Sequence, residues 1–363
     1  MDTEDHDYTA PAAADIAATQ DSQGALRLLI AQRALYAKAK RWTYLRWIGF
    51  SVMGIVAPPL AVFFPKAAVV VGAVAGVWIF LSRTIFKAFE GKLAAQGAAV
   101  QEDFDRLVFD MPPLATRVPC PTPEDLAELA GSDAEVLDRA KQGGLLGWYP
   151  LDRGAAGTVC VAIAQRANAA YSERLQRLNA RYWLTVLVVW TVVIVMTSMI
   201  IGTSLTTFLL GVAAPLLPAC LDIGEQLRSS TQACADRRSM ADDIEHAVRG
   251  TRDNPLNDED LLVWQERLYS LRRSAPLVPD LIYARTRRKN EQAMNHPGFD
   301  ARLLSREGCL HHAEEVRRRV QGPSGPVGHR PCRGVRHPHG LHHRGRQATG
   351  SVLRITAPVG QPS

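Results

Sequence analysis

The sequence predicts an all-α membrane protein with four transmembrane helices arranged as two hairpins and joined by helical cytoplasmic segments. Three observations support this prediction: apolar residues gather in two blocks, basic residues flank both blocks, and no alternating strand pattern of useful length occurs. The 363 residues are 47% hydrophobic, an average that would also suit a soluble protein. The uneven distribution of the apolar residues, rather than their number, indicates a lipid bilayer.

The first apolar block covers residues 47–86 and contains two runs separated by Lys66. The run Trp47–Pro65 has no charged side chain and is long enough for a span, because about 20 apolar residues cross a hydrocarbon core. The run Ala67–Leu81 is shorter, but Arg83 can extend its guanidinium group to the interface. We therefore expect two spans here, joined by an outer turn.

The second apolar block covers residues 182–221 and predicts the second hairpin. Its runs Tyr182–Ile201 and Leu205–Leu221 are uncharged, and Gly202 begins the turn between them. A soluble protein with two such hairpins would need a buried four-helix core without a polar face on any helix, which is uncommon.

The basic residues near the span ends predict the orientation. Lys and Arg accumulate on the cytoplasmic side of membrane proteins. The outer turns hold only Lys66, whereas the other span ends carry Arg33, Lys38, Lys40, Arg41, Arg46, Arg83, Lys87, Lys92, Arg174, Arg177 and Arg181. We expect a multi-pass membrane protein with both termini in the cytoplasm. The acidic opening MDTEDHDY indicates no cleavable secretory signal.

Three regions form the predicted cytoplasmic part: an N-terminal region, 1–46, with a juxtamembrane helix, and two helical regions, 87–181 and 222–295. We expect helices over 23–45, 85–108, 161–181, 222–248 and 258–294. The helix over 161–181 should continue into the third span. Capping patterns begin at Thr122 and at Ser132, and Gly143-Gly144 ends the second of these short helices.

Residues 296–363 form a basic tail of different composition. After Val316 there are nine Arg and no Asp or Glu, so most of the net charge of +6 lies in this segment and a nucleic-acid polymer is not an expected partner. The tail is predicted to be disordered. Lipid or nucleic-acid attraction through arginine and metal binding through histidine are alternative interpretations, but the abrupt change is typical of a shifted reading frame in a GC-rich gene.

The residues themselves exclude several functions. No ionisable side chain lies inside a predicted span, which disfavours a pump or a secondary transporter. The common catalytic and nucleotide-binding motifs are absent from the sequence, so we expect no enzyme, no metal site and no cofactor.

Small and polar residues in the spans are candidates for helix packing or for lining a pore. Gly72 and Gly76 have a GxxxG spacing that lets helices approach closely. Thr191, Ser198 and Thr206 could line a water path if several copies assembled, or they could bond back to their own helices. Four spans are too few to enclose a wide channel, so a pore requires a homo-oligomer.

Several stretches resemble a known family. They are QRALYAKAKRWTYLR, GAAVQEDFDRLVFDMP, LLGWYP, VAIAQRANAAYSERLQRLNARYW and RLYSLRRSAPLVPDLIYARTRRKNEQAM. Their order and their spacing relative to the spans are similar to the SMODS-associated four-transmembrane effectors of the antiphage systems called CBASS. The resemblance covers residues 23–294. Tyr171-Ser172 departs from the Trp-Asp pair expected there.

The resemblance implies a pore-forming effector that permeabilises the inner membrane when a neighbouring enzyme makes a cyclic oligonucleotide, causing abortive infection. Polar residues in the shared stretches are the candidates for sensing this ligand: Gln101, Glu102, Asp105, Gln165, Arg166, Asn168, Tyr283 and Arg285. A structural role for each is the alternative, since they could pair within the helical layer. A membrane-anchored sensor or scaffold without a pore, and a housekeeping ion channel, remain alternative functions.

Overall fold

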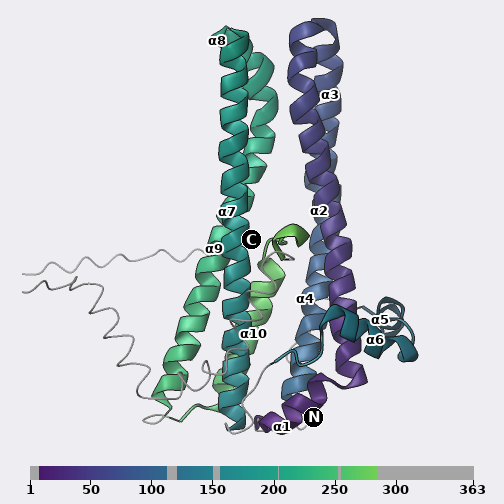
Figure 1. Cartoon of the computed structure of the whole chain (residues 1–363), viewed down its shortest axis with the longest axis vertical. Helices are drawn as coiled ribbons and strands as arrows, with labels where there is room; N and C mark the ends of the chain where they lie inside the picture. Colours follow the sequence, from purple (N-terminus) through teal and green to yellow (C-terminus); the bar gives the residue numbers. More distant parts are fainter. Residues whose placement is uncertain (1–7, 113–120, 150–155, 203, 252–254, 284–363) are drawn as a thin grey trace, which may run out of the picture. The chain divides into compact units, whose positions relative to one another are not determined.

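The computed structural model describes residues 8–112, 121–149, 156–202, 204–251 and 255–283, which belong to one compact unit. Within these ranges every regular element is a helix (Figure 1). The predicted all-α class is therefore confirmed. The predicted tail, residues 296–363, lies outside the described residues.

Two helices of unusual length organise the fold. In chain order the elements are α1 (Ala13–Gln20), α2 (Gln23–Phe63), α3 (Pro65–Leu81), the π-helical η1 (Ser82–Phe86), α4 (Lys87–Phe109), α5 (Pro123–Ala130), α6 (Asp133–Gly143), α7 (Gly157–Ile201), α8 (Leu205–Thr207), the π-helical η2 (Phe208–Ala213), α9 (Ala214–Gly250) and α10 (Asp258–Ser274). Helix α2 has 41 residues and α7 has 45, and each joins a polar half to an apolar half without a break. The predicted continuity of the helix through Tyr182 is confirmed.

Local chemistry sets where the long helices begin and end. The Ser22 hydroxyl accepts a hydrogen bond from the Ala25 amide at 3.3 Å and caps the start of α2. Phe64 leaves the helical region, with φ −133° and ψ 75°, because the residue before a proline avoids the α conformation and Pro65 opens α3. Gly202 ends α7 with φ 70°, a left-handed conformation that glycine adopts without strain.

The structure tests three predicted helix ends. The capping box at Thr122 is confirmed, since its hydroxyl and the Asp125 carboxylate each accept a backbone amide. Helix α6 begins after Ser132 as predicted, but its predicted capping box is wrong because the Ser132 side chain makes no cap hydrogen bond. Within the predicted helical region 258–294, α10 ends at Ser274, Pro276 and Pro279 interrupt the pattern, and residues 280–283 are helical again, while 284–294 lie outside the described residues.

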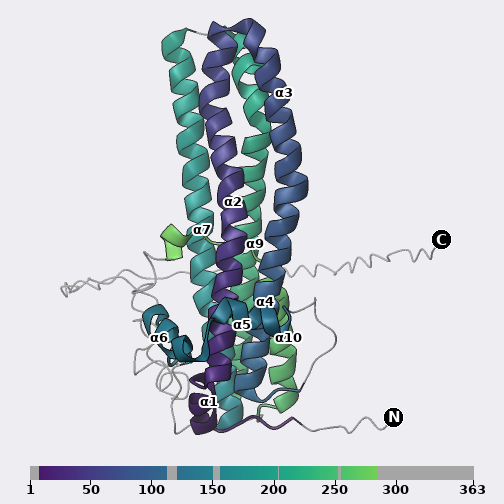
Figure 2. The same ribbon diagram turned by 90° about the vertical axis from the view of Figure 1, so that its right-hand side faces the viewer.

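The helices pack as two antiparallel sets with α10 between them. Helix α7 runs against α9, and α2 runs against α3 and then α4 (Figures 1 and 2). Helix α10 contacts α4, α7 and α9, while α5 and α6 lie against α2. The hydrophobic core lies in this polar half of the helices, around the buried side chains of Ile16, Leu29, Phe104, Ile244 and Leu261.

The other half of the long helices exposes large apolar side chains. Ile55 on α2 is 71% exposed, Val69 on α3 is 77% exposed, and Ile200 on α7 is 81% exposed. By length and composition, two helical stretches among the described residues could cross a membrane, Val69–Phe109 and Gly157–Ile201. Only 6% and 0% of their apolar windows are buried, so neither window is the core of a soluble bundle.

Gly49 permits the close approach of α2 and α3. A Cβ atom at Gly49 would collide with the indole ring of Trp78 on α3. We predict that Gly49→Ala lowers the stability of the protein by about 1 to 3 kcal/mol, because the rigid ring must move. Thermal unfolding in detergent measures this change.

Gly91→Ala is the matched control for that substitution. Gly91 also lies within a helix, but it is exposed and an added Cβ would meet nothing within 4 Å. This variant should keep or slightly raise the unfolding temperature, since alanine favours helix. Equal unfolding temperatures for the two variants would contradict the packing role of Gly49.

Candidate functional site

A group of polar side chains meets where α4, α7, α10 and the loop ending at Tyr149 come together. We call it the buried polar cluster, and it comprises Glu102, Asp105, Tyr149, Gln165, Asn168, Gln265 and Arg272. Glu102 and Asp105 are three residues apart on α4, a spacing that places both on one helix face. Both residues are fully buried.

Helix α10 supplies the groups that meet these two carboxylates. Arg272 places Nη2 2.6 Å from Asp105 Oδ2 and Nη1 3.6 Å from Glu102 Oε2. The amide of Gln265 donates to Glu102 Oε2 at 2.8 Å and to Asp105 Oδ2 at 3.0 Å. Gln265 and Arg272 are seven residues apart, about two helical turns, so both side chains lie on the face of α10 that packs on α4.

The loop before residue 150 and helix α7 complete the cluster. Tyr149 donates its hydroxyl to Asp105 Oδ1 at 2.6 Å and accepts a bond from the Asn168 amide at 3.4 Å. Gln165 donates to the Gln265 side-chain oxygen at 3.1 Å and to the Leu261 carbonyl at 2.9 Å. The cluster therefore ties α4, α7, α10 and this loop to one another through hydrogen bonds and ion pairs.

Burial and the neighbouring charges shift the pKa values of two groups in the cluster. Burial alone would lower the pKa of the Arg272 guanidinium, but the adjacent Asp105, Tyr149 and Glu102 raise it above its ordinary value. Burial, with a further contribution from Asp105, raises the pKa of the Tyr149 hydroxyl well above its ordinary value. Arg272 thus stays a cation and Tyr149 stays a hydrogen-bond donor at physiological pH.

The structure places four of the predicted sensing residues, Glu102, Asp105, Gln165 and Asn168, in the buried polar cluster. Gln101 is buried beside them on α4. Arg166 instead pairs with Glu245 on α9, and the Tyr283 ring lies under the Lys40 ammonium group, 5.8 Å from it. Arg285 lies outside the described residues.

Three members of the cluster were missed by the sequence reasoning. Tyr149 and Arg272 fall within the shared stretches LLGWYP and RLYSLRRS, and Gln265 lies just before the second stretch. The sequence signal that could have identified Tyr149 and Arg272 was their position within these shared stretches. Nothing in the sequence separates the buried Arg272 from its exposed neighbour Arg273, because that difference depends on how α10 is seated on α4.

The cluster can hold helices together, but its charges oppose a simple anion site. A phosphate entering here would meet the two carboxylates, and Arg272 already contacts both of them. In this conformation both carboxylates are already paired with Arg272 and Gln265.

A second set of charges lies where the apolar halves of the helices begin. Arg46 on α2 pairs with Glu90 on α4 at 2.8 Å and donates from Nε to the Ser82 hydroxyl at 3.2 Å. Two further pairs, Arg83–Asp222 at 2.5 Å and Lys87–Glu225 at 2.9 Å, connect η1 and α4 to α9. The hydrogen bond and charge of Lys87 lower the pKa of Glu225.

The candidates for packing or pore lining are surface residues of the single chain. Gly72 and Gly76 are exposed, and a Cβ at either would meet nothing within 4 Å. Thr191 donates its hydroxyl to the Leu187 carbonyl of its own helix at 2.8 Å. Thr206 is exposed and Ser198 is half-buried. Among the described residues there is no group of three or more side chains that could hold a metal ion.

These features define a helical membrane protein, in which exposed apolar helix halves contact the lipid bilayer and a polar bundle continues from the same helices. The chain belongs to the family described as the SMODS-associating 4TM effector domain, whose match covers residues 14–297, more than half of the chain. This membership confirms the predicted resemblance and places the chain among CBASS-associated membrane effectors rather than in a known enzyme family. No curated protein and no solved structure matches the chain significantly.

Removal of the Arg272 charge should unfold the bundle more easily. In Arg272→Gln, two carboxylates would stay buried without their cation, which costs about 3 to 5 kcal/mol for a broken buried ion pair. We expect a clear fall in the thermal unfolding temperature of the detergent-solubilised protein.

Arg273→Gln is the control, since Arg273 is the adjacent residue of the same type and is exposed. Its unfolding temperature should stay near that of the unchanged protein, because exposed charges contribute little. A similar fall in both variants would contradict the assigned role of the cluster.

Proposed function

We propose that this protein permeabilises the bacterial inner membrane in response to a cyclic oligonucleotide and so causes abortive infection. The proposal is supported above all by one observation: helix α7 and the helical stretch Val69–Phe109 each carry both an exposed apolar half and members of the buried polar cluster. A change in the cytoplasmic bundle can therefore reach the membrane without passing through a flexible linker.

In the proposed arrangement the apolar halves form four spans in two hairpins, with both termini in the cytoplasm. The ends of α2 and α7 support it, since both lie at the end of the long helices opposite α1 (Figure 2). Aromatic side chains at Trp47, Tyr182 and Trp183 lie where the apolar runs begin, as expected for a membrane interface.

The ion pairs at the base of the apolar halves are the proposed closed-state contacts between the hairpins. Arg83 and Lys87 belong to the first hairpin and its continuation, while Asp222 and Glu225 follow directly after the second. A ligand that shifts α10 would move α4 relative to α9 and strain these pairs. The proposed ligand acts on the cytoplasmic bundle, where the predicted sensing residues lie.

The proposed pore is formed by several copies. Four helices cannot surround a wide channel, and the exposed face of α3 around Gly72 and Gly76 offers a surface on which a second copy could pack closely. Helix association in lipid depends on such close packing, because apolar burial gives little driving force there.

Leakage from liposomes tests the proposed function directly. The full-length protein is reconstituted in phosphatidylethanolamine and phosphatidylglycerol vesicles that hold a self-quenched dye. A panel of cyclic di- and trinucleotides is then added. We expect dye release with at least one member of the panel and little release without it, because the ligand shifts the bundle toward the open arrangement.

Linear dinucleotides of the same bases serve as the control and should release no dye. A protein that leaks equally with and without every nucleotide would be an unregulated channel. A protein that never leaks, although it binds one of the nucleotides, would be a membrane-anchored sensor or scaffold. Either result would overturn the proposal.

Replacement of Gly72 and Gly76 by Leu should reduce assembly. The larger side chains would hold neighbouring helices apart, so we expect a several-fold lower yield of crosslinked oligomer in liposomes, and less leakage. Val74→Leu is the control, since Val74 is 58% exposed on the same helix and already carries a branched side chain. Unchanged crosslinking in the variant that replaces both glycines would show that this surface of α3 is not part of the interface between copies.

A further inference from the structure

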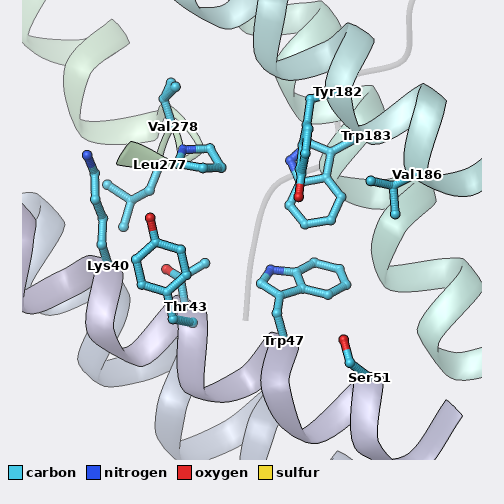
Figure 3. A pocket seen from close by; sticks show the side chains of 11 residues that line it. Lys40, Thr43, Trp47, Ser51, Tyr182, Trp183, Val186, Leu277 and Val278 are labelled. Atoms are coloured by element: carbon cyan, nitrogen blue, oxygen red, sulfur yellow. The ribbon is translucent and has the colours of Figure 1, made fainter. Parts of the chain in front are cut away.

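A cavity of about 160 Å³ lies between α2, α7 and the segment that follows α10. Its lining residues come from all three: Lys40, Thr43, Tyr44, Trp47, Ser51, Tyr182, Trp183, Val186, Leu277, Val278 and Pro279. Figure 3 shows the Trp47 and Trp183 rings on one side and Lys40 with Leu277 on the other. The cavity is separate from the buried polar cluster, with which it shares no residue.

The cavity lies at the boundary between the polar and apolar halves of the helices. Both apolar runs start within its lining, at Trp47 on α2 and at Tyr182 on α7. One side of the cavity is therefore polar and the other side apolar. In a membrane this is the depth of the lipid headgroups, where tryptophan and tyrosine gather.

The polar groups of the lining are hydrogen-bond donors or hydroxyls, and none of the lining residues is acidic. Trp183 is only 5% exposed, and its buried Nε1 has no hydrogen-bond partner among the residues that the structure describes. Its ring lies 4.3 Å from that of Trp47, centroid to centroid. A buried donor without an acceptor is costly, so an acceptor supplied by a ligand would stabilise this side of the cavity.

Lys40 supplies the positive charge of the cavity. Its ammonium group lies 2.5 Å from Asp280 Oδ1, with its side chain 17% exposed. Asp280 also holds Tyr44, because the Asp280 amide donates to the Tyr44 hydroxyl at 2.9 Å. The exposed Arg41 on α2 and Arg181 on α7 directly neighbour the lining residues Lys40 and Tyr182 in the sequence and add further positive charge.

We propose that this cavity binds the phosphodiester headgroup of an anionic phospholipid from the cytoplasmic leaflet. The phosphate oxygens accept hydrogen bonds from Lys40 and from the Trp183 indole. Acyl chains then lie on the exposed apolar surface that continues from the cavity, at Ile48 and Val52 on α2 and at Leu184 on α7. Basic residues near the membrane surface favour anionic lipid.

The size of the cavity restricts what can occupy it. Pockets for whole drug-sized ligands usually have volumes of about 300 to 1,000 Å³, so this cavity admits one headgroup phosphate and its neighbouring atoms. A cyclic oligonucleotide would not fit inside it. The inference therefore concerns a lipid site distinct from the proposed nucleotide response, and it depends only on membrane contact.

The site would join the two halves of the molecule at the interface. The segment after α10 reaches α2 through Asp280 and reaches α7 through the Pro276 carbonyl, which accepts a bond from Gln176 Nε2 at 2.9 Å. A bound phosphate shares Lys40 with Asp280 and rests against Leu277 and Pro279. Lipid binding would thus strengthen the contact between α2, α7 and this segment.

Native mass spectrometry of the full-length protein tests the proposal. The protein is mixed with equal amounts of phosphatidylglycerol and phosphatidylcholine, and the retained lipid is measured. We expect preferential retention of phosphatidylglycerol, reduced about tenfold by Lys40→Gln and several-fold by Trp183→Phe, since each removes one donor to the phosphate. Trp183→Phe keeps an aromatic ring, so it tests the indole donor without emptying the core.

Lys38→Gln and Trp190→Phe are the matched controls, because neither residue lines the cavity. They should retain phosphatidylglycerol as the unchanged protein does. Equal retention in Lys40→Gln and Lys38→Gln would overturn the proposal. Displacement of the lipid by millimolar inorganic phosphate would assign the site to a soluble anion, and this result would also overturn it.

Discussion

Arg272 lies in a position that water cannot reach, and its charge is balanced there by Asp105 and Glu102. Removing such groups from water is unfavourable, so they remain buried only while their partners stay in place. Asp105 is on α4 and Arg272 is on α10, and Gln265 and Tyr149 extend the same network to α7 and to the preceding loop. The packing of α10 on α4 and α7 depends on this group of contacts.

The long helices carry that arrangement toward the lipid. Helices α2 and α7 change from polar to apolar within a single uninterrupted element, so the position of each apolar half follows from the packing of its polar half. Ion pairs such as Arg83–Asp222 connect the two sets of helices at the level where this change occurs. The proposed lipid site lies at the same boundary. Ion pairs and hydrogen bonds thus hold the polar halves of the helices together, whereas lipid packs against their apolar halves.

The fold could be predicted to a large extent because helix periodicity, caps and apolar runs are local properties. The continuity through Tyr182 and the cap at Thr122 both follow from neighbouring residues. The break after Ser274 is local too, because Pro276 and Pro279 separate α10 from the helical residues 280–283. The missing cap bond at Ser132 shows that a suitable sequence does not ensure the hydrogen bond. Of the cluster, the sequence indicated Glu102, Asp105, Gln165 and Asn168 as important, but not their partners.

The sequence by itself determined the helical class, the segregation of apolar residues and the relationship to a family of membrane effectors, because each depends on the order and spacing of neighbouring residues. Only the tertiary structure decided that Arg272 rather than Arg273 is buried, that Arg166 pairs with Glu245, and that Lys40 and Trp183 share one cavity. These contacts join residues separated by up to 170 positions along the chain. No local pattern encodes them, since they arise from the way whole helices pack against one another.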